Sequence, residues 1–518
     1  MPFVRCAIGA LFAVTLPLGA QELGHITFPT SGKPAAQPEF VRGVLLLHSF
    51  QYDQAAEAFR RAQSSDPGFA MAYWGEALTY THQVWNEQDR PAARTALERL
   101  APTRQARLER ATTPRERAYL AAVELLYGDG SKAVRDTLYA AAMEQLARDY
   151  PSDDEAQILH ATALFGLTQG SRDVPTYMRA GAIAQEVFGR NAQHPGAAHM
   201  IIHAFDDPVH APLGLRAARE YSRIAPAAAH AQHMTTHIFL ALGMWPEVVA
   251  QNRVASGPDS ARWRAGHSTH WLLYGYLQQG RFEAARALLA SLTAHAGGDA
   301  RFRGMLANFR ARYVLETGRW TSPEAFALDA DSGVAGEDGY EYATFASGYA
   351  AAERGDRRRA EARLARLARV NGAATASLRP GARGVDVVPV IMELTLRAAL
   401  VRQDAGVDSA LVLLRHAAAL EDGMPAEFGP PAVPVPVHES LGSILAAAGR
   451  TAEAAAEFAR ALTLQPGRSA ALLGSARTEG GRGRPEDARR AWSRLADNWR
   501  EADADVPGLA DARARADK

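Results

Sequence analysis

The stretch PVHESLGSILAAAGRTAEAAAEFARALTLQP, residues 436–466, predicts two helices that pack against each other across a short turn. Gly442 lets the two helices approach closely, and Gly449 ends the first of them. The second helix packs through residues at helical spacing: Ala454, Phe458 and Ala461. Pro466 then ends it, so the stretch predicts one helix-turn-helix unit.

Residues 39–67 repeat this plan near the start of the chain. Five of their residues match one for one: Gly43, Ala55, Phe59, Ala62 and Pro67. Weaker copies can be registered on Ala77, Ala161, Gly243, Gly280, Gly318 and Gly355. The pattern resembles the tetratricopeptide repeat (TPR), a unit of about 34 residues. This resemblance implies an all-α, right-handed solenoid of about ten stacked helix-turn-helix units, whose first helices line a concave groove.

Length and composition agree with a helical repeat protein. A chain of 518 residues is long for one core, and it is rich in Ala, Leu, Arg and Glu, which favour helix. Lys plus Arg and Asp plus Glu each number 57, so the formal net charge is zero. This balance argues against a nucleic-acid partner or an anionic membrane, both of which attract basic proteins.

The N-terminus is typical of a secretory signal peptide. Arg5 precedes an apolar run, Cys6–Leu18, that is too short to span a bilayer, and Gly19 and Ala20 offer a cleavage site. We therefore expect an exported protein, periplasmic or secreted, with no transmembrane segment in its mature chain. Cys6 is the only cysteine, so a metal site in the mature chain would need nitrogen and oxygen ligands.

The repeats and composition predict six segments. These are a signal peptide (1–20), an N-terminal linker (21–38), a TPR-like solenoid with a His-rich groove (39–320), degenerate repeats with a Pro-rich linker (321–434), C-terminal TPR repeats (435–505) and a polar tail (506–518). In the middle of the chain Ile202 and Leu273 stand where a small residue is expected, which predicts looser packing there.

Nine of the sixteen histidines fall between His194 and His270, at helical spacing. At about 100° per residue, His199, His203 and Asp206 share one helix face. The TPR register places these three on the groove-lining stripe, together with His230, His233, His237, His267 and His270. Three adjacent units therefore present seven imidazoles and one carboxylate to one groove.

Other polar and aromatic residues are weaker candidates for the groove lining. They are His48, Trp74, His82, Asp207, His210 and Glu439, although core packing also explains Trp74. Burial of Glu76 would be costly without an Arg or His partner, so such a partner is expected.

The histidine pattern favours a divalent transition metal. Neutral imidazole is the commonest metal ligand, and spacing of four residues directs two imidazoles to one ion. Asp206 or Asp207 would complete the ligand set or orient an imidazole from behind, in a site suited to Zn, Cu, Fe or Mn. The zinc-protease motif H-E-x-x-H is absent, because Met200 replaces its glutamate between His199 and His203.

Four motifs extend the family resemblance: AYWGEA (72–77), HPGAAHMIIHAFDDPVHAPLGL (194–215), HMTTHIF (233–239) and EFGPP (427–431). They make the chain similar to a family of exported bacterial TPR proteins with a His-rich central segment, for which the resemblance implies fold and context but no reaction. Three functions remain open: a metal-binding protein with a peptide, protein or small-molecule ligand in its groove, a metal-dependent hydrolase or oxidoreductase, and a metal-free protein-interaction scaffold. In the metal-free case the histidines would be a polar lining or acid–base groups.

Overall fold

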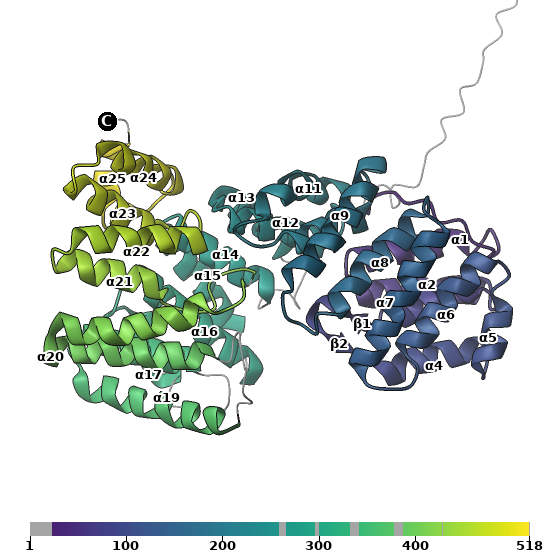
Figure 1. Ribbon diagram of the computed structural model, residues 1–518, viewed down its shortest axis with the longest axis horizontal. Helices are drawn as coiled ribbons and strands as arrows, with labels where there is room; N and C mark the ends of the chain where they lie inside the picture. Colours follow the sequence, from purple (N-terminus) through teal and green to yellow (C-terminus); the bar gives the residue numbers. More distant parts are fainter. Residues whose placement is uncertain are drawn as a thin grey trace, which may run out of the picture. The chain divides into compact units, whose positions relative to one another are not determined.

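The computed structural model describes residues 23–257, 266–295, 300–331, 341–377, 387–426 and 428–516, and these form an all-α chain (Figure 1). Among them the only strands are β1 (Thr81–His82) and β2 (Glu87–Gln88), a short antiparallel pair joined by the 3₁₀ turn η2 (Gln83–Trp85). Within these ranges no helix combines the length and apolarity that crossing a bilayer requires. The predicted all-α class is confirmed, whereas the signal peptide lies outside the described residues.

The chain divides into two compact units. Among the described residues, the first contains 23–167, 184–198 and 223–228, and the second contains the remainder. Eight helices lie in the first unit: α1 (Gln37–His48), α2 (Tyr52–Ser65), α3 (Ala70–Leu78), α4 (Arg90–Leu100), α5 (Arg104–Arg110), α6 (Pro114–Leu126), α7 (Lys132–Asp149) and α8 (Asp154–Gly166). Three helices contribute residues to both units: α9 (Val174–Arg190), α10 (Pro195–Ala204) and α11 (Ala211–Ile224).

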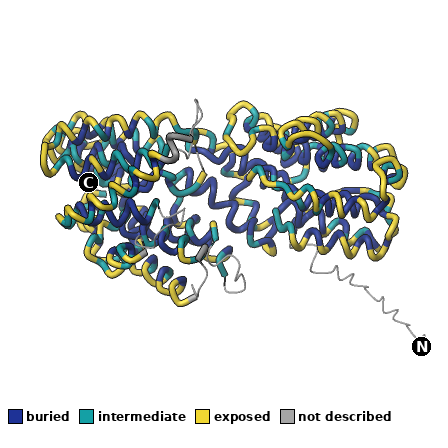
Figure 2. The backbone as a smooth tube through the Cα atoms, turned by 90° about the horizontal axis from the view of Figure 1, so that it is seen from below, coloured by how far each residue is buried: buried dark blue, intermediate teal, exposed yellow. Residues whose placement is uncertain are grey.

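The second unit holds the other helices. They are α12 (Ala229–Ala241), α13 (Trp245–Ala255), α14 (His267–Gln278), α15 (Phe282–His295), α16 (Ala300–Thr317), α17 (Pro323–Asp331), α18 (Glu341–Glu353), α19 (Arg357–Ser377), α20 (Val388–Asp422), α21 (Val437–Ala447), α22 (Thr451–Leu464), α23 (Ser469–Gly481), α24 (Pro485–Asn498) and α25 (Leu509–Arg515). Gly406, at φ 83° and ψ −179°, kinks α20 into two helical halves. Figure 2 shows that helices within each unit turn buried residues inward and exposed residues outward.

The two strongest predicted repeats pack in the same way. A Cβ atom on Gly43 would lie 2.6 Å from the ring of Phe59, and one on Gly442 would lie 2.9 Å from the ring of Phe458. In both repeats the same phenylalanine also packs on a glycine of the next helix, Gly75 or Gly474. The sequence signal for close helix approach is therefore confirmed at both ends of the chain.

The turns between paired helices use glycine in the left-handed conformation. Five glycines on which the repeats were registered have φ between 64° and 78°: Gly243, Gly280, Gly318, Gly355 and Gly449. A side chain is strained at such φ values, so glycine ends the first helix of each pair at low cost. In the repeat of residues 39–67, Phe50 takes this place with φ 52°.

Exchange of Gly474 for Ala is expected to destabilise the second unit by about 1–3 kcal/mol, because the added Cβ would lie 2.2 Å from the ring of Phe458. Gly481→Ala is the matched control in the same helix, where a Cβ meets nothing within 4 Å. Helix propensity makes this control neutral or slightly stabilising. Urea unfolding of both variants measures the difference, and equal midpoints would contradict the packing described.

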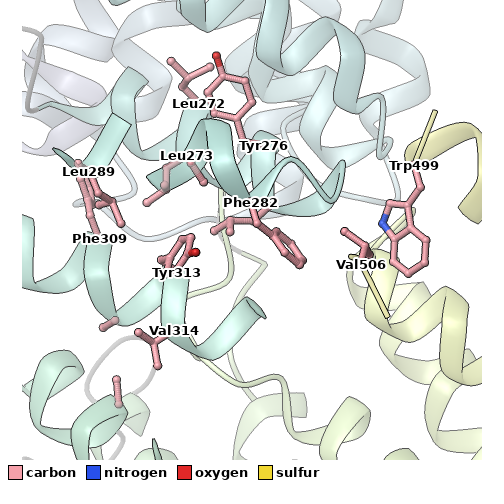
Figure 3. Close-up of a cluster of buried hydrophobic side chains, with 14 of the residues drawn as sticks. Leu272, Leu273, Tyr276, Phe282, Leu289, Phe309, Tyr313, Val314, Trp499 and Val506 are labelled. Carbon is pink, nitrogen blue, oxygen red and sulfur yellow. The ribbon is translucent and has the colours of Figure 1, made fainter. Parts of the chain in front are cut away.

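The predicted linker and tail are both part of the packed structure, which corrects the sequence-based expectation. In the described part of residues 21–38, Phe28 packs against Phe40 and Tyr119, with ring centroids 5.5 and 5.2 Å apart. In the expected polar tail, Val506 and Leu509 are buried, and Figure 3 shows Val506 beside Trp499. Neither segment shows a sustained helical pattern of apolar residues in the sequence. Only their long-range contacts show that they belong to the core.

The two large residues in the middle of the chain, Ile202 and Leu273, are both fully buried. Their burial does not test how closely the helices approach each other, so looser helix packing there stays a prediction. Leu273 of α14 belongs to the core cluster that also contains Phe309 and Tyr313 of α16 (Figure 3).

Candidate metal centre

Three helices of the His-rich segment bring six imidazoles into two adjacent groups. The inner trio consists of His199 and His203 on α10 and His230 on α12. The outer trio consists of His233 and His237 on α12 and His267 on α14. In each trio one nitrogen per ring lies within 4.8 Å of the others. All six belong to the second unit.

The two trios differ in their access to solvent. His199, His203 and His230 are buried, as are His233 and His237, but His267 is exposed. The outer trio therefore reaches the protein surface through one ligand candidate. The inner trio has no exposed member.

Hydrogen bonds behind the outer trio hold a proton on Nδ1 of two of its rings. The amide nitrogen of Asn252 donates to Val248 O at 2.9 Å and to Thr236 Oγ1 at 3.2 Å, so its oxygen faces His233. His233 Nδ1–H donates to that oxygen at 2.8 Å. His237 Nδ1–H donates to Asp206 Oδ2 at 2.5 Å. In the neutral imidazoles, both Nε2 atoms are then left with lone pairs.

These two lone pairs point at each other. His233 Nε2 and His237 Nε2 lie 3.1 Å apart. Two such lone pairs repel each other unless a proton on one nitrogen or a metal ion lies between them. Tetrahedral sites with metal–nitrogen bonds of about 2.0–2.1 Å place their nitrogens about 3.3 Å apart. The observed separation therefore fits two ligands of one metal ion, each oriented by a hydrogen bond at its other nitrogen.

Burial keeps several of these imidazoles neutral. It lowers the pKa of His233 to about 3, with a smaller contribution from His237. Burial, followed by the neighbouring imidazoles, also holds the pKa of His203 and of His230 well below the usual range. At neutral pH no proton must leave these three rings before a metal binds.

An aromatic wall that sequence reasoning missed surrounds the outer trio. The ring centroid of Trp271 lies 3.9 Å from that of His267 and 5.1 Å from that of His237. Phe428 lies 5.4 Å from His237. Gly429 follows with φ 99°, and a Cβ there would lie 2.4 Å from Trp271. The EFGPP motif, described from Phe428 onward, thus covers the outer trio, and its glycine allows the close approach.

Hydrogen bonds from two side chains of neighbouring helices hold the loop that carries the EFGPP motif. Arg312 Nη2 donates to Pro431 O at 2.6 Å, and the Tyr342 hydroxyl donates to Ala432 O. The predicted Pro-rich linker is therefore a cover that two side chains hold in place over the histidines. The EFGPP motif indicated a functional segment, but the sequence could not show that this segment lies over the outer trio.

Asp206 and Asp207 have different roles in the structure. Asp206 is the hydrogen-bond partner of His237, which is the orienting position that the sequence offered as one of two options. Asp207 instead pairs with Arg172 at 2.6 Å and with His210 Nδ1 at 2.8 Å. Burial alone would raise the pKa of Asp207, and these partners bring it below the usual value.

His270, expected with the ligand set, lies outside both trios. Its ring stacks on Phe309 at 5.4 Å with an interplanar angle of 17°. Burial and the charge of Arg312 lower its pKa to about 3. His270 follows His267 by three residues on α14. Its ring packs on α16, whereas the ring of His267 lies with His233 and His237.

His48 belongs to a different group, in the first unit. Its Nε2 lies 2.6 Å from Glu155 Oε2, and His194 Nε2 lies 3.2 Å from Glu155 Oε1. His194 Nδ1 accepts the backbone N–H of Ala197, so its Nε2 carries the proton and faces the carboxylate. The three residues form a buried triad in which both imidazoles face one carboxylate. Sequence reasoning missed Glu155 and His194 here.

The remaining expected groove residues lie elsewhere. Trp74 is buried in the core against Phe28, at 5.8 Å, which corrects its assignment to the groove. His82 stacks on Tyr52 at 4.1 Å. Glu439 pairs with the buried Arg468, Nε to Oε2, at 2.6 Å.

The expected partner of Glu76 is present, which confirms that prediction. This fully buried carboxylate accepts from Arg60 Nε at 2.8 Å and also pairs with Arg99. Glu76 is therefore a structural ion-pair member of the first unit.

A cavity of about 350 Å³ in the second unit borders the outer site through Asp206. Its lining also includes Trp245, Gly429 and Arg460. Glu421 lies in the same wall, and burial raises its pKa to about 7. The cavity has the size of a small-ligand site, and four carboxyl side chains lie along its wall: Asp206, Asp207, Glu421 and Asp422.

Comparison with known proteins gives fold-level similarities only. No protein-family model matches the chain, and no curated protein matches its sequence. The human IFIT1 dimer with m7Gppp-AAAA is 12% identical over 91% of each chain, with TM-score 0.37. Yeast Tom70 is 12% identical over 93% of this chain and 95% of its own, with TM-score 0.29. The APC/C hetero-tetramer Cut9–Hcn1 is 12% identical over 94% of this chain and 97% of its own, with TM-score 0.28. The fold assignment rests on this chain's own helix pairs.

Proposed function

We propose that this protein is an exported helical-repeat protein that binds a transition-metal ion at the outer trio, or a ligand through that ion. The observation that supports this most is the 3.1 Å separation of two Nε2 atoms whose protons are held at the opposite nitrogens by Asn252 and Asp206. Imidazole ligands suit Zn, Cu and Fe, and the absence of cysteine after residue 6 leaves no thiolate competitor.

Export is part of the proposal. It is supported by the apolar run Cys6–Leu18 behind Arg5 and by the motifs that resemble exported bacterial TPR proteins. A periplasmic or secreted protein meets metal ions without the buffering of the cytosol, so a site of this kind could capture them there.

Metal content tests the proposal. The mature chain, prepared without a polyhistidine tag, is expected to carry at least one equivalent of metal in elemental analysis. After chelation, addition of Zn, Cu or Mn is expected to raise its thermal midpoint. His270→Gln serves as a matched control on α14, because that ring lies outside both trios. Sub-stoichiometric metal in the wild type together with no thermal stabilisation would contradict the proposal.

A metal-dependent enzyme is the second candidate. The observation in its favour is the cavity of about 350 Å³ that shares Asp206 with the outer trio, together with the exposed ligand candidate His267. Exposure of one ligand leaves room for a coordinated water or substrate. Turnover of chromogenic ester or phosphoester substrates by the metal-loaded chain, lost on chelation, would distinguish an enzyme from a binding protein.

A further inference from the structure

We propose that the inner trio binds a second ion, a univalent copper ion, so that the six imidazoles form a two-ion centre. The inference rests on the proposed function, because the outer trio supplies the neighbouring site. It differs from that proposal in the number of ions and in the identity of the second one.

The ring positions divide the six histidines into two neighbouring groups. Within the inner trio, the ring centroid of His199 lies 4.8 Å from that of His203 and 5.1 Å from that of His230. Between the trios, His203 lies 6.0 Å from His237. His230 lies 6.2 Å from His233. Ring nitrogens converge within 4.8 Å in each trio separately, so two adjacent ions can each take one trio.

The two trios have the same architecture. Each combines a pair of histidines four residues apart on one helix with a single histidine from the next helix of the repeat series. In the inner trio the pair lies on α10 and the single histidine on α12. In the outer trio the pair lies on α12 and the single histidine on α14. The centre thus repeats with the helices that carry it.

Charge separates the two sites. The inner trio contains three buried imidazoles and no carboxylate, because Asp206 is hydrogen-bonded to His237 of the outer trio. Arg172 donates to the backbone carbonyls of His203 and Ala204, and its charge is paired with Asp207, so this pair supplies no anionic ligand to the inner trio. The cost of moving an ion from water into a dry site grows with the square of its charge. A dry site of neutral imidazoles without a carboxylate therefore favours a univalent ion, and copper is the univalent metal that imidazole binds well.

Anaerobic titration of the metal-free mature chain with copper(I), against a chromophoric copper(I) chelator, tests the proposal. The wild type is expected to bind two copper(I) ions. His203→Gln and His199→Gln are each expected to bind one, whereas the control His270→Gln binds two. Glutamine is chosen because it keeps a neutral polar side chain in place of the imidazole. Circular dichroism of the metal-free variants checks that each is folded. If one of them is not, His230→Gln takes its place.

The outcomes separate the two proposals. One copper(I) ion in the wild type, lost in His233→Gln but kept in His203→Gln, overturns the second site and leaves the outer site standing. Binding of two copper(I) ions by every inner-trio variant also overturns the second site. So does a wild type that binds two zinc ions but only one copper(I) ion in parallel titrations. A wild type that binds no ion of any kind overturns both proposals.

Discussion

Exchange of His237 for Gln is expected to abolish the stabilisation that bound metal gives to the protein. A ligand at a thousand times its Kd stabilises the folded state by about 4 kcal/mol, and this gain disappears when the ion no longer binds. His237 contributes one of the two Nε2 atoms that face each other at 3.1 Å, so its loss leaves the ion with too few ligands. Thermal unfolding of both proteins with and without metal measures the effect.

A graded companion to this variant is Asp206→Asn. The carboxylate orients His237 and increases its basicity through a 2.5 Å hydrogen bond, and loss of such a partner costs about 10–100-fold in metal affinity. Competition titration gives the Kd of each protein. If Asp206→Asn bound metal as tightly as the wild type while His237→Gln did not, His237 would be a ligand without the orienting partner assigned to it.

Exchange of Glu155 for Gln is expected to destabilise the first unit by about 3–5 kcal/mol, the usual cost of removing one partner from a buried charged pair. His48 and His194 both face this fully buried carboxylate. In the variant the amide nitrogen would face one of the two rings, and His194 Nε2–H needs an acceptor there. Urea unfolding, with hydrogen exchange of α1 and α8 to localise it, measures the loss. Asp154→Asn is the control, because that neighbouring carboxylate pairs with the exposed Arg190.

The same variant has a characteristic pH dependence. Burial by itself raises the pKa of Glu155, but the charges and hydrogen bonds of His48 and His194 outweigh it and hold that pKa well below its usual value of 4.5. A depressed acid pKa contributes stability that is complete above about pH 4.5 and is lost as the pH falls through the folded-state value. The difference between wild type and Glu155→Gln is therefore expected to shrink below about pH 4.5. A constant difference across this range would contradict the ionised state of Glu155.

The fold could be predicted largely because its signals are local. Gly43 and Gly442 each lie sixteen residues before the phenylalanine on which they pack, within one helix pair. The core roles of Phe28 and Val506 were missed because their partners are far away in the sequence or outside any helical period. Burial of that kind is a property of the assembled unit and has no local pattern.

The candidate site was predicted in part. Helical spacing and the repeat register placed the right helices together, and they selected all six imidazoles of the two trios. The division into two trios could not be predicted, because it depends on how far each helix is displaced from the next. Asn252, Trp271 and Phe428 were missed, since an amide on a neighbouring helix and two aromatic rings are indistinguishable from core residues in sequence. Whether the imidazoles ligate a metal stays a prediction.

A crystal of the metal-loaded chain, measured at the absorption edge of the metal, tests metal binding at the outer trio. We expect an anomalous-difference peak about 2.0–2.1 Å from Nε2 of both His233 and His237. Such a peak would lie between the two atoms that the structure places 3.1 Å apart. Absence of a peak there, with the metal instead at the triad of His48, Glu155 and His194 or nowhere on the chain, would contradict it.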